Sequence, residues 1–346
     1  MRAGVFHASG DIRVDTVPDP SIVEPSDALV RVTRAAICGS DLWFYRGIAA
    51  WKEGWRTGHE FIGVVEAVGA DVTGVRAGDH VIAPFAYSDG TCEFCRQGLQ
   101  TSCLHGGGFG GPDGGGQAEL VRVPLADGTL VAIPPALAED SAWWARVLPL
   151  TDVLPTGHHA VVSSGAHAGD TVAVVGDGAV GLCAVMAARR LGAERILAIG
   201  HNAKRLELAR DFGATETFDS HDADCAERVV EATGGGAPHV AEAVGTQSAM
   251  DLALKVARPG GSVGYVGVPR GIDKVDVGRM FSANIGLRGG VAPVRAYLPE
   301  LLADVVAGKL DPSPVFDLVI GLDQLPAGYG AMDERRAIKV MVEVAG

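Results

Sequence analysis

The pattern of hydrophobic and polar positions changes about halfway along the chain. Up to about residue 150 the apolar residues form short β-branched runs separated by glycine, proline and aspartate, such as "ALVRVTRAAI" at 28–37 and "FIGVVEAVG" at 61–69. Runs of this length and composition are typical of strands joined by turns. We therefore predict a strand-rich, loop-rich first half.

From Thr171 onward, strand-like apolar runs alternate with helical stretches. The pattern predicts strands in "TVAVVGDG", "RILAIG", "HVAEAVG" and "SVGYVGVP", and helices in "AVGLCAVMAARRLG", "NAKRLELARDFG" and "SAMDLALKVARPGG". This alternation is typical of a parallel sheet covered by helices. After about residue 290, "AYLPELLADVVAGKL" predicts one helix and "RRAIKVMVEV" predicts a final strand.

Composition narrows the class of protein. The chain has 346 residues, 47% of them hydrophobic, which is enough for a large core and about two domains. A net charge of −13 argues against nucleic acid and anionic membranes as partners, because both are polyanions. The amino terminus lacks the pattern of a signal peptide, and no apolar run is long enough for a membrane helix. We expect a cytoplasmic protein that acts on a small molecule.

A dinucleotide-binding signal begins at the strand predicted from Thr171. Gly176, Gly178 and Gly181 form a G-x-G-x-x-G pattern, with Ala179 and Val180 within it. The pattern directly follows a predicted strand and opens a predicted helix, so backbone N–H groups can face a pyrophosphate. The alternative is a tight strand-to-helix turn in which the glycines serve packing.

The end of the next predicted strand bears on the choice of coenzyme. An acidic residue there would bind the adenosine ribose hydroxyls, but the chain has Gly200, His201 and Asn202, with Lys204 and Arg205 just beyond. A 2′-phosphate would then meet no like charge and would find basic partners, so we expect NADP to be favoured, with NAD as the alternative. The competing interpretation is a solvated basic helix start.

The first half carries residues of the types that bind zinc. Cys38, His59, Glu60 and Asp152 offer thiolate, imidazole and carboxylate groups, which together suit a catalytic zinc site. They are spread along the chain, so no local spacing groups them. Taken singly, Cys38 is typical of a small buried hydrophobe, and His59 of a core histidine.

A second group of candidate metal ligands is local. "DGTCEFCRQGLQTSC" places Asp89, Cys92, Cys95 and Cys103 in one compact loop, which predicts a four-ligand structural zinc site. In a reducing compartment, clustered cysteines are metal ligands more often than disulfides. Aspartate before glycine is also common at turns, so Asp89 has the alternative role of capping the loop.

Aromatic residues are concentrated in one short segment. Trp43, Phe44, Trp51 and Trp55 lie close together in sequence, although aromatic residues make up only 6% of the chain. One interpretation is that Trp43, Trp51 and Trp55 line an apolar substrate pocket. The other is that they pack in the core or at a subunit contact. We expect the histidines at 158–159 to belong to a helix and not to a metal site.

In its motifs and their order, the chain resembles the zinc-dependent medium-chain alcohol dehydrogenases over essentially its whole length. The matching segments are "CGSD", "GHEFIGVVEAVG", "VRAGDHVIAP", the cysteine loop, "GGGQAELVRVP", "TDVLPTGHHA", "VVGDGAVG" and "LARDFGAT". The resemblance implies an α/β fold in which residues 1–153 and 293–346 form a GroES-like, β-rich catalytic domain. A Rossmann domain with a doubly wound parallel sheet, residues 154–292, would be inserted between them. A homodimer or homotetramer is the expected assembly.

The resemblance also implies roles for individual residues. Cys38, His59 and Asp152 would hold a catalytic zinc, with Glu60 beside it as an exchangeable or outer ligand. The structural zinc, the second metal ion of the chain, would lie in the 89–103 loop, where family members commonly have cysteine in place of Asp89.

For the reaction, Ser40 would be the first member of a proton relay, but Trp43 stands where many relatives have the relay histidine. The expected reaction is hydride transfer between a small apolar or aromatic alcohol, or its aldehyde or ketone, and NADP(H). A polyol or sugar dehydrogenase of the same superfamily that uses NAD is the alternative. A non-catalytic nucleotide-binding protein is the alternative from another class.

Overall fold

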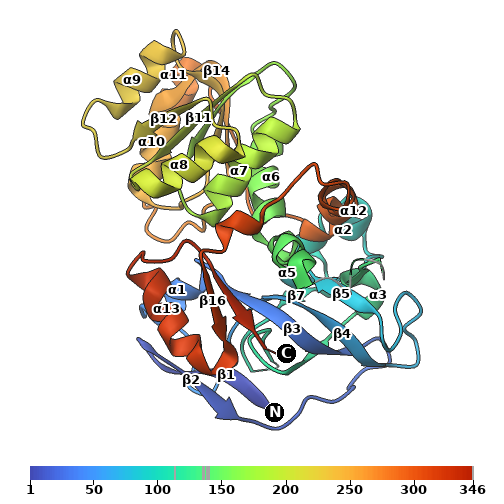
Figure 1. The fold of residues 1–346 in the computed structure, drawn as a ribbon. Helices are drawn as coiled ribbons and strands as arrows, with labels where there is room; N and C mark the ends of the chain where they lie inside the picture. The colour runs from blue at the N-terminus through green and yellow to red at the C-terminus, as the bar shows by residue number, and fades with distance from the viewer. Residues whose placement is uncertain (113, 135–136, 138–140, 345–346) are drawn as a thin grey trace. The chain divides into compact units, whose positions relative to one another are not determined.

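Two compact units make up the protein in the computed structural model, which describes residues 1–112, 114–134, 137 and 141–344 (Figure 1). One unit comprises Met1–Asp152 and Pro293–Gly346, and the other Val153–Ala292. Each unit has a sheet of its own. Within the described residues, none of the helices combines the length and the apolar character needed to cross a bilayer.

The first unit is built on a seven-stranded sheet. Its strands are ordered β16-β17-β3-β4-β5-β9, and β8 also pairs with β3. The bounds are β3 Ala28–Ile37, β4 Glu60–Val68, β5 His80–Ala83, β8 Leu120–Val123, β9 Val131–Ala132, β16 Leu318–Gly321 and β17 Val340–Glu343. Two small antiparallel pairs accompany it: β1 Arg2–Ala8 with β2 Asp11–Thr16, and β6 Ala86–Tyr87 with β7 Gly107–Gly108. The predicted strand-rich first half is thus confirmed.

Short helices connect these strands. They are α1 Asp41–Tyr45, α2 Glu93–Arg96, α3 Ala126–Thr129, α5 Ser141–Val147, α12 Val294–Val306 and α13 Leu325–Asp333. The 3-10 turns are η1 Gln100–Ser102, η2 Leu148–Thr151, η3 Ser313–Val315 and η4 Leu322–Gln324. The helix predicted near residue 300 is α12, and the predicted final strand is β17, which is shorter than the sequence pattern indicates.

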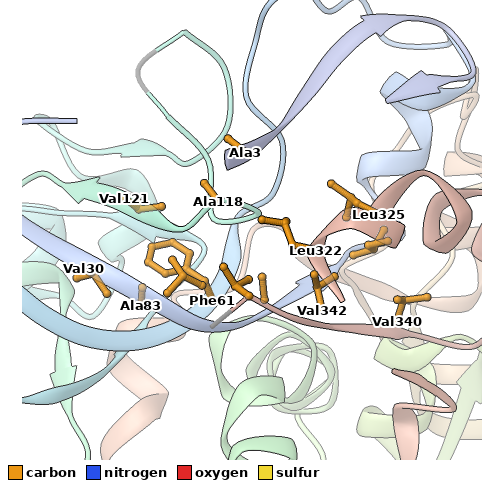
Figure 2. Close-up of a cluster of buried hydrophobic side chains, with 14 of the residues drawn as sticks. Ala3, Val30, Phe61, Ala83, Ala118, Val121, Leu322, Leu325, Val340 and Val342 are labelled. Atoms are coloured by element: carbon orange, nitrogen blue, oxygen red, sulfur yellow. The ribbon is translucent and has the colours of Figure 1, made fainter. Parts of the chain in front are cut away.

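Residues from both ends of the chain share the core of the first unit. Figure 2 shows Phe61 of β4 among side chains that include Val30 of β3 and Val342 of β17. Alternate residues of β3 from Ala28 to Val32 are buried, because successive side chains of a strand point to opposite faces. The C-terminal segment therefore completes a core that the N-terminal strands begin.

Antiparallel pairing brings the end of β3 next to the starts of β4 and β17. Ala36 near the end of β3 pairs with Glu60 at the start of β4, and Ile37 pairs with Val340 at the start of β17. Residues that follow β3 and residues that open β4 and β17 are therefore neighbours.

The second unit contains a six-stranded sheet in which all neighbouring strands are parallel. The order is β12-β11-β10-β13-β14-β15, that is 3-2-1-4-5-6 in chain order, the Rossmann arrangement. The strands are β10 Thr171–Val175, β11 Arg195–Gly200, β12 Glu216–Asp219, β13 Ala237–Glu242, β14 Ala257–Tyr265 and β15 Gly286–Gly289. The α/β fold class predicted from the sequence is confirmed.

Two groups of helices cover this sheet. α6 Val153–Ser163, α7 Ala179–Arg190 and α8 Ala203–Phe212 pack in sequence on one another, while α9 Cys225–Ala232 packs on α10 Gln247–Val256. α11 Val277–Ala283 follows β14. The predicted helix at 248–261 ends early, at Val256, because Ala257 pairs with Ala237 and begins β14. Pro259 cannot donate a helical hydrogen bond, which is consistent with this end.

Candidate catalytic metal site and coenzyme site

The four dispersed candidate ligands of the first unit lie together in the structure. One ligand atom from each of Cys38, His59, Glu60 and Asp152 lies within 4.8 Å of the others. Cys38 Sγ is 3.3 Å from Asp152 Oδ2, and His59 Nε2 is 3.5 Å from the same oxygen. Cys38 follows β3, His59 immediately precedes β4, Glu60 is the first residue of β4, and Asp152 follows η2. The pairing of β3 with β4 explains why residues so far apart in sequence meet.

Asp41 holds two of these residues in place. One carboxylate oxygen accepts a hydrogen bond from the Cys38 backbone N–H at 3.0 Å, and the other lies 3.3 Å from His59 Nδ1. The Asp41 side chain is only 2% exposed. Because Nδ1 faces Asp41, Nε2 is the nitrogen that faces the cluster, the arrangement typical of a metal-binding histidine.

Gly58 fixes the backbone just before His59. Its φ is +89°, and a Cβ at this position would lie 2.8 Å from the backbone nitrogen of Gln117. Both the conformation and the close approach require glycine.

A buried ion pair lies beside the cluster. Lys339 Nζ, just before β17, is 2.6 Å from Glu60 Oε1, and both side chains are at most 1% exposed. The same amine donates to the Ile37 carbonyl at 3.3 Å. Burial raises the pKa of Glu60, and the charge of Lys339 only partly offsets that shift. The second oxygen, Oε2, is buried and has no hydrogen-bond partner in the described structure. An unpaired buried oxygen of this kind suits a nearby cation.

The electrostatics of the cluster favour protonated ligands unless a cation is bound. Burial, with the charges of Asp152 and Glu60, raises the pKa of the Cys38 thiol to about 11. Burial lowers the pKa of His59, but the attraction of Asp41 and Cys38 outweighs it and raises that pKa well above its ordinary value. A divalent cation would displace these protons. Sulfur, imidazole nitrogen and carboxylate oxygen within a few ångströms form a donor set that fits zinc.

The cysteine loop forms a second cluster. Ligand atoms of Asp89, Cys92, Cys95 and Cys103 all lie within 4.8 Å of one another. Cys92 Sγ is 3.8 Å from Cys103 Sγ, and the Asp89 backbone N–H donates to Cys103 Sγ at 3.3 Å. Three thiols and a carboxylate fit a tetrahedral zinc site.

Asp89 also has the turn-capping contacts that the sequence left as its alternative role. Its Oδ1 accepts hydrogen bonds from the backbone N–H groups of Thr91 and Cys92 at 2.7 and 2.9 Å. Its Oδ2 lies 2.6 Å from Nδ1 of His105, a residue that the sequence analysis missed. Burial raises the pKa of Asp89, but these hydrogen bonds hold it well below its usual range. Its role as a zinc ligand stays a prediction.

In the second unit, the glycine pattern lies between β10 and α7. Gly176 has φ +126°, and a Cβ at Gly181 would lie 2.0 Å from the Gly176 carbonyl oxygen. Gly178 is the N-cap of α7 and provides no side-chain cap, and a Cβ there would meet nothing within 4 Å. A helix N-terminus without a side-chain cap, with open space beside its glycine N-cap, fits the pyrophosphate of a dinucleotide.

The end of β11 differs from the sequence expectation in one respect. The sequence analysis found no acidic residue at the end of β11, but the carboxylate of Asp177 lies next to Gly200: a Cβ built on Gly200 would be 2.9 Å from Asp177 Oδ2. Arg205 is buried, and its Nη1 lies 3.9 Å from Asp177 Oδ1. Asn202 caps α8 through the Arg205 backbone N–H at 3.3 Å. Among the predicted basic partners, Lys204 remains exposed at the surface.

Comparisons with known proteins agree with this geometry. Residues 24–135 match the model of the alcohol dehydrogenase GroES-like domain, and residues 179–307 match that of the zinc-binding dehydrogenases. An alcohol dehydrogenase of Cupriavidus necator is 33% identical over 97% of this chain and 96% of its own length. An uncharacterized zinc-type alcohol dehydrogenase-like protein of Bacillus subtilis is 33% identical over 99% of this chain and all of its own. The solved structure of alcohol dehydrogenase TADH from Thermus sp. ATN1 has a TM-score of 0.91, 37% identity and full coverage of both chains.

The chain belongs to the zinc-dependent medium-chain dehydrogenase family. It is a zinc-type alcohol dehydrogenase-like oxidoreductase. The resemblance inferred from the motifs is thereby confirmed. The family uses a nicotinamide coenzyme, and one similar solved structure, a zinc-binding dehydrogenase from Sinorhizobium meliloti with 27% identity and a TM-score of 0.84, contains NADP.

In this family member, the aromatic segment after Cys38 packs largely on itself. The ring of Trp51 lies 4.5 Å from that of Phe44 and 5.8 Å from that of Phe6, and Trp55 stands edge-on to it at 6.3 Å. Trp51 also contacts the hydrophobic core of the first unit. Trp43 lies in α1 and is half-buried. The pocket role of these tryptophans stays a prediction.

Two residues of the metal site were not recognised in the sequence analysis. Asp41 belongs to the "CGSD" segment, so the motif itself could have indicated it. Lys339 carries no local signal, because its partner Glu60 lies in a distant strand. The histidines at 158–159 lie in α6, as expected.

Proposed function

We propose that the protein catalyses reversible hydride transfer between a small apolar or aromatic alcohol and a nicotinamide coenzyme. The observation that carries the proposal is the convergence of Cys38, His59, Glu60 and Asp152 within 4.8 Å. A zinc ion bound by these residues supplies Lewis acidity toward the oxygen of an alcohol or carbonyl group. We further propose that residues 1–153 with 293–346 form the catalytic domain and that residues 154–292 form the coenzyme domain of a cytoplasmic homo-oligomer.

The residues of the chain then have distinct tasks. Cys38, His59 and Asp152 would hold the metal, and Asp41 would orient the His59 ring through Nδ1. Lys339 would keep the Glu60 carboxylate ionised and directed beside the metal ligands.

In this proposal Ser40 would receive the proton that an alcohol loses. Its Oγ lies 3.2 Å from Cys38 Sγ and 3.5 Å from His59 Nε2. A hydroxyl can accept one proton while it donates its own to the next acceptor. Trp43 cannot continue this relay, because the indole N–H only donates. Water or a ribose hydroxyl of the coenzyme is therefore the next acceptor in our proposal.

An apolar or aromatic substrate is favoured over a polyol. The ring of Phe85 stands edge-on to His59 at 6.3 Å, so an aromatic side chain borders the metal cluster. A polyol site needs several polar partners for the substrate hydroxyls. A non-catalytic nucleotide-binding protein is disfavoured, because such a protein has no need of the Cys38 cluster or of the buried Glu60–Lys339 pair.

The preference for NADP remains part of the proposal. It is supported by the exposed His201 and Lys204 beyond β11, and by the absence of a side chain at Gly200. The burial of Arg205 beside Asp177 weakens it, because that guanidinium is already engaged.

One activity panel tests the function. The purified protein is assayed for oxidation of NADPH and NADH with aromatic and aliphatic aldehydes and ketones, and for the reverse reaction with alcohols and polyols. Each assay is repeated with phenanthroline and with its non-chelating isomer. We expect the highest kcat/KM with aromatic or apolar carbonyl compounds and NADPH, and loss of activity with the chelator alone. Activity that survives prolonged chelation, or that is highest with polyols, would contradict the proposal.

A further inference from the structure

Asp177 occupies the place that a side chain at the end of β11 would fill. A Cβ built on Gly200 would lie 2.5 Å from Asp177 Cβ and 2.9 Å from Asp177 Oδ2. The Asp177 side chain is only 5% exposed. Many Rossmann domains carry an acidic residue at the position of Gly200, where it binds the ribose hydroxyls. In this chain a carboxylate reaches the same place from the glycine-rich turn.

The hydrogen bonds of Asp177 engage the donors that an anion would use at this position. Its Oδ2 accepts from the backbone N–H groups of His201 and Asn202, both at 2.9 Å. Asn202 is the N-cap of α8, so these N–H groups stand in front of a helix N-terminus, where negative charge is stabilised.

A positive charge close to Asp177 is also buried. Arg205 Nη1 lies 3.9 Å from Asp177 Oδ1, and the two side chains are 8% and 5% exposed. Two other basic residues that follow β11, Lys204 and His201, are exposed, and the ring of His201 stacks on that of His221 at 4.3 Å. A 2′-phosphate bound at the end of β11 would thus have both exposed basic groups and a buried carboxylate as neighbours.

We propose that Asp177 replaces the missing carboxylate at position 200 and lowers the affinity for NADP relative to NAD. The proposal rests on the proposed function only in that the chain binds a nicotinamide dinucleotide. The 2′-hydroxyl of NAD is a donor that a carboxylate can accept, whereas a 2′-phosphate adds negative charge beside Asp177 and competes for the same two N–H groups. Asp177 thus weakens the binding of a 2′-phosphate that the exposed basic groups favour. The ratio of the affinities for NADP and NAD reflects both effects.

The proximity of Asp177 to Gly200 determines which substitutions can test this proposal. Gly200→Asp does not test the absence of a carboxylate, because its Cβ would clash with Asp177. Asp177→Asn is the sharper variant, since it removes the charge while keeping the size and one oxygen that accepts from the backbone. The double variant Asp177→Gly with Gly200→Asp moves the carboxylate to the usual position and relieves the clash.

The test is the dissociation constant of NADH and of NADPH, measured by coenzyme fluorescence on the purified full-length chain without substrate. We expect Asp177→Asn to raise the affinity ratio of NADPH to NADH by about tenfold or more, the effect of removing one close like charge. The double variant should bring the ratio back toward that of the wild type. Asp222→Asn, which removes one exposed carboxylate from the same unit, is the matched control and should leave the ratio within about twofold.

The outcomes separate this inference from the proposed function. An unchanged ratio in folded Asp177→Asn overturns the role of Asp177, while coenzyme binding itself still supports the proposed function. If Asp177→Asn does not fold, the double variant decides: a ratio like that of the wild type supports the inference, and a ratio shifted toward NADH contradicts it, because the carboxylate at position 200 would then add a discrimination that Asp177 does not supply. A wild-type protein that binds neither coenzyme would overturn both.

Discussion

The two metal-ligand clusters of the first unit are built in opposite ways. The loop cluster takes Asp89, Cys92, Cys95 and Cys103 from one short segment, and only Cys95 among them is fully buried. The Cys38 cluster takes its residues from three separate places and buries three of the four. A local cluster depends mainly on its own turns, whereas the dispersed cluster forms only if β17, β3 and β4 pair with one another.

The surroundings of the two clusters differ as well. Buried charged side chains, Asp41 and Lys339, control the charge of the Cys38 cluster. In the loop cluster, backbone N–H groups and the exposed His105 stabilise the charge of Asp89. Substitutions around the first cluster should therefore change the stability of the protein and its chemistry. Substitutions around the second should act mainly on the loop.

The largest expected effect is the loss of stability when the buried Glu60–Lys339 ion pair is broken. Lys339→Met leaves Glu60 without its partner and should lower the free energy of unfolding by about 3 to 5 kcal/mol. Urea unfolding at neutral pH measures it. The matched control is Lys309→Met, because Lys309 is exposed and its amine lies 3.3 Å from Asp304. That control should cost at most about 1 kcal/mol. Equal losses in the two variants would show that the buried pair has no special part in holding this edge together.

The next effect concerns zinc binding and pH. Near neutral pH both Cys38, whose pKa is about 11, and His59, whose pKa is well raised, hold protons in the metal-free protein. Zinc needs both groups deprotonated, so its affinity should rise about 100-fold per pH unit. Competition with a zinc-binding dye measures it, and the difference between wild type and Cys38→Ser isolates this site. An affinity independent of pH would contradict the account.

The stability of the metal-free protein should fall as pH rises, whereas its zinc affinity should increase. The folded protein binds the protons of Cys38 and His59 more tightly than the unfolded chain does. The stabilisation from His59 is therefore complete below its ordinary pKa and is lost as pH rises through the raised one. Thermal unfolding in the presence of a chelator should show a lower Tm at about pH 8 than at about pH 6.

A smaller effect is expected from the residue that orients His59. Asp41→Asn keeps an oxygen for the Cys38 N–H but removes the charge facing Nδ1, so kcat/KM should fall about 10- to 100-fold. Asp11→Asn, which changes a partly exposed carboxylate paired with Arg13, serves as the control. The two variants should differ in kcat/KM and in retained zinc, and a kcat/KM equal to that of wild type in Asp41→Asn would exclude the orienting role.

The smallest effect is expected in the loop. Asp89→Ala removes two backbone hydrogen bonds and should cost about 1 to 2 kcal/mol and release zinc from the loop. Asp89→Cys should keep the zinc, because thiolate and carboxylate both suit the tetrahedral ion. Tm and metal content are the readouts, with coenzyme binding unchanged in both. Equal zinc content in wild type and Asp89→Ala would mean that Asp89 only caps the turn.

Local patterns predicted much of this structure. The loop cluster, the glycine turn before α7 and the strand–helix alternation of the second unit all depend on residues close in sequence, and the sequence analysis found them. The predicted helix at 248–261 failed at its end, where the pairing of β14 with β13 outweighs local helical preference. The short strands β12 and β15 were missed, because their periodic pattern is too brief to recognise.

Contacts between distant residues were beyond the sequence. The Glu60–Lys339 pair depends on the register of β17 against β3, which no spacing reveals. Asp177 was quoted within the glycine pattern but given no role, since only its position beneath Gly200 shows where its charge acts. The donor types of the Cys38 cluster indicated a catalytic zinc site, but no spacing grouped its members, and the role of each one came from the resemblance.

Metal content and activity of Cys38→Ser show whether the Cys38 cluster binds the zinc ion that the reaction needs. We expect about two zinc ions per chain in the wild type and about one in the variant, with no measurable alcohol oxidation and coenzyme dissociation constants within about twofold of wild type. Cys95→Ser is the matched control, because it exchanges the same atom in the loop cluster and should also lose one zinc while keeping its chemistry. Full activity in Cys38→Ser would contradict the account.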